Sequence, residues 1–204
     1  MPRQNRVTPF GDIVATPARG RFMGNRGCLH DASGRLVRQT RLNAWIYCLL
    51  EFKGRRRALM QPGRYTELFF LDEATALAAG HRPCAECQRG RYKEFMRCWA
   101  LGNPSLVGEG KLRAPVVDAV LQRERMGPGG EKVIYRARIG DLPERCFVTT
   151  YDRETHGHLI EEGGLRAWHP GKYGALTNAP KNLKVSVLTP ASTVKAIAAG
   201  FVPK

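Results

Sequence analysis

The sequence contains no apolar run long enough to cross a membrane. Its longest apolar stretches, residues 45–50 and 68–71, fall far short of the roughly 18 consecutive apolar residues that a membrane span needs. The basic residues near the N-terminus are not followed by the apolar segment of a secretory signal. We therefore expect a protein that has no membrane partner and stays in the cytoplasm.

Internal repeats and low-complexity tracts are also absent from the sequence. Hydrophobic residues make up 43% of the chain and charged residues 25%, which is close to the average for globular proteins. A chain of 204 residues can bury a sufficient core without disulfides. These values predict one compact domain or two small ones.

Acidic residues are scarce relative to basic ones. The chain has 18 Asp and Glu against 33 Lys and Arg, which gives a net charge of +15. Arginine accounts for 24 of the basic residues, and its planar guanidinium group suits phosphate oxygens better than a lysine does. We therefore expect an anionic partner, with nucleic acid ahead of an acidic protein or a basic surface without function.

The residue patterns predict an α+β protein that begins with a small sheet-and-helix domain. Strands are expected at 12–14 and 44–52, and Lys53-Gly54 can turn the second strand back onto residues 58–60. A helix is expected over 73–79, with Asp72 as its N-cap and Gly80 as its stop. The periodicity of apolar residues predicts a second helix over 88–101.

A glycine- and proline-rich stretch at 102–131 marks the expected boundary between two parts. It contains one predicted helix, which starts at Pro115 and ends before Gly127. Strands at 132–139, 146–151 and 158–160 then predict a β-rich module. A final helix is expected with Thr189 as its N-cap, Pro190 at its first position and Gly200 as its stop. The expected organisation is a zinc-nucleated domain at 1–101, a linker at 102–131 and a β-rich C-terminal module at 132–204.

The six cysteines include one pair with metal-ligand spacing, Cys84 and Cys87. A Cys-x-x-Cys turn that enters a helix can direct both sulfur atoms at one ion, and a structural zinc ion needs four ligands. The second pair is expected from a glycine-rich turn that contains Cys28 and His30. The predicted cofactor is therefore zinc, bound by Cys28, His30, Cys84 and Cys87.

The cysteine pattern leaves two other interpretations open. The pair can be redox-active, or the cysteines can be buried without a metal. Cys48, Cys98 and Cys146 stand among apolar neighbours and are expected to be packing residues, with Cys98 as a substitute ligand. His81 is expected near the site or on the surface, not as a ligand.

Residues 69–87, with the sequence FFLDEATALAAGHRPCAEC, resemble the second half of the Ada-type zinc-binding domain of DNA alkylation-repair proteins. Residues 22–30, FMGNRGCLH, are similar to the strand that delivers the other ligands in that family. The resemblance implies a zinc site, and it implies that one zinc-bound thiolate accepts a methyl group from a DNA phosphotriester. That role would fall on Cys28. A Cys-x-His pair in place of two cysteines makes the site less anionic, which favours structural zinc over methyl transfer.

Three groups of basic residues are candidate phosphate ligands. The first group consists of arginines that alternate with Gly20, Gly24 and Gly27. The second is an arginine triplet after the expected hairpin turn. The third is the polar face of the second helix, although such a face is often merely solvated. The predicted nucleic-acid contacts are Arg19, Arg21, Arg26, Arg55, Arg56, Arg57, Arg89, Arg91 and Lys93.

Residues 151–169 group two histidines, His156 and His158, with acidic residues, so a catalytic role there is a weak alternative to a simple turn. The sequence as a whole predicts a zinc-containing nucleic-acid-binding protein that acts on DNA rather than RNA, in repair or processing. One alternative is a zinc-dependent nucleic-acid enzyme, which uses Cys28 for methyl transfer or the two histidines for hydrolysis. A protein-interaction module with structural zinc is the other.

Overall fold

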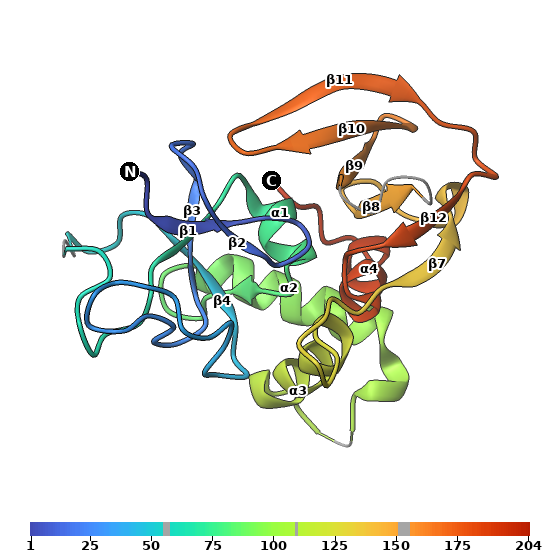
Figure 1. The fold of residues 1–204 in the computed structure, drawn as a ribbon. Coiled ribbons are helices and arrows are strands. Elements are labelled where there is room, and N and C mark those ends of the chain that lie inside the picture. Colours follow the sequence, from blue (N-terminus) through green and yellow to red (C-terminus); the bar gives the residue numbers. More distant parts are fainter. Residues whose placement is uncertain (55–57, 109, 151–155) are drawn as a thin grey trace.

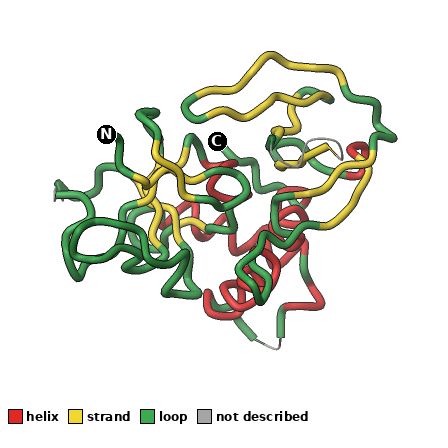
Figure 2. Tube along the Cα trace, in the orientation of Figure 1, coloured by secondary structure: helices red, strands yellow, loops and turns green. Residues whose placement is uncertain are grey.

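The computed structural model describes residues 1–54, 58–108, 110–150 and 156–204. Within them the chain forms two six-stranded sheets and four α-helices, so the predicted α+β class is confirmed. The first sheet lies on the left of Figure 1 and the second on the upper right, with α2, α3 and α4 between and below them. Figure 2 shows the long loops of the N-terminal half. No helix in the described ranges combines the length and apolar character of a membrane span.

The first sheet has the strand order β2-β1-β5-β3-β4-β6. Its strands are β1 (Gln4–Val7), β2 (Ile13–Ala15), β3 (Phe22–Asn25), β4 (Ile46–Leu49), β5 (Leu68–Phe70) and β6 (Arg82–Pro83). Gly24 of β3 faces the Phe70 ring so closely that a Cβ atom on it would lie 2.4 Å from a ring carbon. This position therefore requires glycine.

Two helices follow the first sheet much as the sequence predicts. In α1 (Glu73–Ala78) the Asp72 carboxylate accepts a hydrogen bond of 2.8 Å from the Thr75 amide, and Gly80 ends the segment with a φ of +86°. The second helix, α2 (Arg89–Gly102), buries Phe95 and Trp99 on the face that the periodicity marks.

The expected hairpin onto residues 58–60 is wrong. These residues form a turn, in which the Met60 backbone adopts the left-handed conformation with a φ of 54°. The Met60 amide donates to a Glu67 carboxylate oxygen at 2.7 Å instead of pairing with a strand. The predicted arginine contacts Arg55, Arg56 and Arg57 lie outside the described residues.

The second half begins with α3 (Ala114–Arg125), which occupies the place of the predicted linker helix. The second sheet has the order β11-β10-β9-β8-β12-β7. Its strands are β7 (Tyr135–Arg138), β8 (Phe147–Thr150), β9 (His158–Glu161), β10 (Gly164–His169), β11 (Lys172–Asn178) and β12 (Lys184–Val187). Short 3₁₀ helices at Pro104–Leu106 and Ile139–Asp141 complete the connections.

The final helix, α4 (Ala191–Ala198), starts one residue later than predicted. Pro190 occupies the N-cap position, and no side chain caps the helix. The Thr189 hydroxyl accepts a hydrogen bond of 2.9 Å from the Phe147 amide, so it serves β8 instead of the helix. Gly200 follows α4 with a φ of +103°, as expected for a helix stop.

One hydrophobic cluster connects the two sheets across the stretch at 102–131. The Phe95 ring of α2 meets the Phe201 ring edge-on at a centroid distance of 5.3 Å, which joins the first helices to the C-terminal segment. The cluster includes Val7, Leu68, Phe70, Phe95, Trp99, Leu121, Val148, Val185, Val187 and Phe201. The glycine-rich stretch therefore connects two parts of a shared core.

Candidate metal centre

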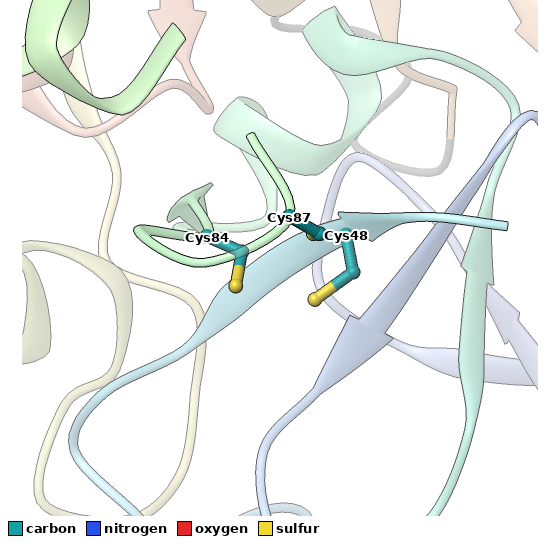
Figure 3. A group of neighbouring side chains, drawn as sticks. All are labelled: Cys48, Cys84 and Cys87. Atoms are coloured by element: carbon teal, nitrogen blue, oxygen red, sulfur yellow. The ribbon is translucent and has the colours of Figure 1, made fainter. Parts of the chain in front are cut away.

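Three cysteines from separate segments converge at the edge of the first sheet. The sulfur atoms of Cys48, Cys84 and Cys87 all lie within 4.8 Å of one another. Cys48 belongs to β4, whereas Cys84 and Cys87 lie on the turn between β6 and α2 (Figure 3). This is the one group of three or more potential ligands that the described His, Cys, Asp and Glu residues form.

The pairing of β4 with β6 creates this arrangement. The two strands are parallel, with Ile46 opposite Arg82 and Tyr47 opposite Pro83, so Cys48 and Cys84 are the next residues in register. The Cys84 amide donates to the Tyr47 carbonyl at 3.0 Å, which extends the ladder into the turn. The sheet thus aligns Cys48 with the Cys-x-x-Cys turn.

The surroundings of the three thiols shift their pKa values in different directions. The hydrogen bond with Cys48, followed by backbone groups of Cys87 and Glu86, lowers the pKa of Cys84 to about 5 against the opposing effect of burial. The same bond with Cys84, together with burial, raises the pKa of Cys48 far above its usual value. Burial also raises the pKa of Cys87. The surroundings of Cys84 thus favour its thiolate form, and a bound cation would favour loss of the remaining protons.

A layer of buried polar groups fixes the turn behind the cysteines. The Gln88 amide side chain donates to the Tyr47 carbonyl at 2.9 Å, and the Tyr47 hydroxyl donates to the Glu73 carboxylate. Arg91 of α2 donates to both Glu73 oxygens, at 3.0 and 2.5 Å, and to the Val202 carbonyl at 2.7 Å. These contacts tie β4 and the start of α2 to α1 and to the C-terminal segment.

Cys28 and His30, the expected second ligand pair, are not part of this group. The Cys28 thiol donates to the His30 carbonyl at 3.5 Å. The His30 ring is buried, with Nδ1 2.6 Å from the Thr66 hydroxyl and Nε2 3.2 Å from the Gln61 carbonyl. Because both ring nitrogens already have protein partners, His30 has a structural role. Among the described residues, the structure therefore brings Cys84 and Cys87 together with Cys48, and not with the expected pair Cys28 and His30.

Sequence reasoning assigned Cys48 to packing because it stands within an apolar run. In the structure Tyr47 is buried, whereas Ile46 and Cys48 on either side of it are half-buried. This alternation was available in the sequence, since neighbouring residues of a strand face opposite sides. The pairing of β4 with β6 was not, because β6 has only two residues.

The predicted nucleic-acid contacts divide into exposed and internal residues. Arg91 is paired with Glu73 and Glu94, and Arg26 is buried in the interior. The remaining described members are exposed, namely Arg19, Arg21, Arg89 and Lys93.

The other candidates lie away from the cysteine group. Cys98 and Cys146 are buried in α2 and just before β8, which agrees with a packing role. His81 is fully buried, contrary to a surface position. His156 is exposed and His158 begins β9, and the acidic residues between 151 and 155 lie outside the described residues.

In comparisons with protein-family models, curated proteins and solved structures, nothing matches this chain. A proposal for the function of the chain therefore rests on the cysteine group and its surroundings.

Proposed function

We propose that the chain binds a zinc ion through Cys48, Cys84 and Cys87 and binds nucleic acid, with DNA as the partner in repair or processing. The observation that carries the proposal is the convergence of three sulfur atoms within 4.8 Å on a sheet edge. Thiolate ligands favour soft metals, and zinc with several cysteine ligands is a common structural ion. Three cysteines supply three of the four positions that zinc prefers.

Charge next to the metal centre supports a polyanionic partner. Arg21 directly precedes Phe22, which pairs with Leu49 of β4, and Arg89 lies two residues after Cys87. Leu49 and Leu50 are 39% and 49% exposed at the end of this strand. The two exposed guanidinium groups can contact the phosphates of a nucleic acid. Zinc would hold the cysteine turn, and hence Arg89, in place. The resemblance of residues 69–87 to the Ada-type domain points in the same direction.

Two measurements on the whole protein test the proposal. Metal analysis of purified protein should find about one zinc per chain. Fluorescence anisotropy with a labelled duplex should show affinity that falls steeply with salt, and Arg21→Ala and Arg89→Ala should each reduce the salt slope by about 1. Lys184→Ala is the matched control, because Lys184 is exposed on β12 in the other sheet. Folded protein without metal would refute the zinc site. Absence of DNA binding at low salt would refute the nucleic-acid partner. An RNA duplex in the same assay tests the preference for DNA.

A second candidate, methyl transfer from a DNA phosphotriester, is favoured by the partial exposure of Cys48 and Cys87 in the cluster. In that reaction the sulfur atom forms a bond to the methyl carbon, the carbon–oxygen bond breaks, and the phosphate leaves as a diester anion. Cys28, the residue to which the resemblance assigns this role, lacks the neighbouring thiols. Mass spectrometry after incubation with methylated DNA decides the matter, since the reaction adds one methyl group to a cysteine peptide. An unchanged mass excludes it.

A further inference from the structure

A cavity of about 400 Å³ lies between the loops of the first sheet and the C-terminal end of α3. None of the cysteines lines it. Its polar lining consists mainly of charged residues from distant parts of the chain. These are Asp12, Arg26, Arg125, Glu131 and Lys132.

Two of the cations are arginines that are almost completely removed from solvent. Arg26 is 1% exposed and Arg125 is 3% exposed. Both guanidinium groups lie against the Trp45 ring, 3.8 and 3.9 Å from its centroid. Burial of two like charges around one indole is costly unless an anion compensates for it.

The partners of Arg26 carry no compensating charge. Its Nε donates to His81 Nε2 at 3.2 Å, and one of its terminal nitrogens donates to the Gly11 carbonyl at 3.0 Å. Burial holds the pKa of His81 well below its usual value, so this ring is neutral. The other terminal nitrogen, Nη2, is buried and has no acceptor among the described residues.

Arg125 and Lys132 are likewise bound only to neutral oxygen atoms. Arg125 donates to the Gly80 carbonyl at 2.8 Å and to the Asn43 carbonyl at 2.6 Å, whereas its buried Nε finds no acceptor in the described part of the chain. The Lys132 ammonium group donates to the Ala78 carbonyl at 2.5 Å.

The two acidic residues of the cavity form no ion pair with these cations, although Asp12 acts on Arg26 and Lys132 from a distance, as Asp118 does on Arg125. Asp12 and Glu131 are both exposed, and the Glu131 carboxylate lies against the backbone of Gly127. Across the described ranges, no carboxylate oxygen comes within 4.0 Å of the charged groups of Arg26, Arg125 or Lys132. The residues that line the cavity thus include three cationic side chains, and two of these carry a buried nitrogen donor that lacks an acceptor within the described residues.

We propose that this cavity binds the phosphoryl group of a phosphate monoester. A phosphate dianion offers two negative charges and several acceptor oxygens, which matches the three cations and their remaining donors. The cavity is larger than a single ion requires and lies in the size range of small-ligand sites, so it has room for the rest of a nucleotide. The phosphoryl group can belong to a free nucleotide or to the 5′ end of a nucleic-acid strand. This inference depends neither on the cysteine cluster nor on the proposed function.

Calorimetric titration of the whole protein tests the inference. A nucleoside 5′-monophosphate should bind, and the nucleoside without phosphate should not. Lys132→Gln should weaken binding about tenfold, because it removes one charge but keeps a donor for the Ala78 carbonyl. Asp12→Asn should strengthen binding about threefold, because it removes an opposing charge at an exposed position. Lys184→Gln on β12 should leave affinity unchanged.

A comparison of oligonucleotides with a 5′-phosphate and a 5′-hydroxyl group distinguishes the two sources of the phosphoryl group. A preference for the phosphorylated strand would show that the cavity binds the 5′ end of a strand. Equal affinity for the two oligonucleotides, combined with binding of the mononucleotide, would show that it binds a free nucleotide. The inference is overturned if no phosphate monoester binds, if citrate binds as tightly, or if both charge variants match the wild type. Binding of mononucleotide without binding of DNA would retain this inference and refute the proposed function.

Discussion

Replacement of Cys48 by alanine tests which cysteines hold the metal. The structure places its sulfur within 4.8 Å of those of Cys84 and Cys87, whereas the Cys28 thiol donates to a carbonyl outside the group. Zinc binding in structural sites contributes about 10–16 kcal/mol, or about 2.5–4 kcal/mol per ligand when it is divided equally among four. Loss of one ligand should therefore weaken zinc affinity about 10²- to 10³-fold, since about 1.4 kcal/mol corresponds to a factor of ten.

Competition with a chromophoric zinc chelator measures this change. Cys28→Ala is the matched control, because it also removes a half-buried thiol from the N-terminal half. We expect it to change zinc affinity by less than about threefold, a smaller effect than loss of an outer-shell partner usually has. The reasoning is refuted if Cys48→Ala retains wild-type affinity, and the ligand set predicted from the sequence is restored if Cys28→Ala loses it.

Three further predictions concern the surroundings of the two sites. Asp118→Ala should lower the free energy of unfolding by about 3–5 kcal/mol and the Tm by about 10 °C. The reason is that Arg82 stays buried without the carboxylate that it contacts at 2.7 and 2.8 Å. A Tm that changes by less than about 2 °C would contradict this. Gly24→Ala should lower the free energy of unfolding by about 1–3 kcal/mol in denaturant titration, because the added Cβ clashes with the Phe70 ring. An unchanged free energy of unfolding would show that the ring moves freely. Burial and the two nearby arginines lower the pKa of Lys132 to about 7, so its charge is present below that pH and lost above it. Sulfate is a dianion throughout this range, so it should raise the Tm more at pH 6 than at pH 8 in a thermal shift assay. An equal rise in Tm at both pH values would contradict the role of Lys132.

Two other cations and two carboxylates line the cavity beside Lys132. Burial also lowers the pKa values of Arg26 and Arg125, but to about 9, so both stay charged at pH 6 and pH 8. Asp12 and Glu131 supply the negative charges, and Asp12 acts on both Arg26 and Lys132. Lys132→Gln should abolish the difference between the two pH values.

Local signals predicted the helices well. The Asp72 cap, the Gly80 stop and the apolar spacing of α2 are properties of short segments, and each was confirmed. Thr189 was misassigned because a distant amide, that of Phe147, competes for its hydroxyl. Propensity describes a segment in isolation, whereas such a contact depends on the complete fold.

The cysteine group also combines a local signal with a contact that depends on the complete fold. The Cys-x-x-Cys turn could be predicted because its geometry is local, but its third member depends on the parallel pairing of Ile46 with Arg82, 36 residues apart. Arg26 was predicted to contact phosphate from its glycine-rich neighbourhood. The sequence could not show that Arg26 lies in the interior beside Trp45 and Arg125, because those contacts come from three separate segments.

The common interior of the two sheets means that the polypeptide cannot be dissected at its glycine-rich middle. A fragment that ends at residue 101 would lose Phe201, the partner of Phe95, and a fragment that starts at 132 would expose valines that now pack against the other half. We therefore expect neither piece to fold on its own. We therefore expect removal of the proposed ion at the cysteines to increase the proteolysis of β9 to β11 as well, because the two sheets share one hydrophobic cluster.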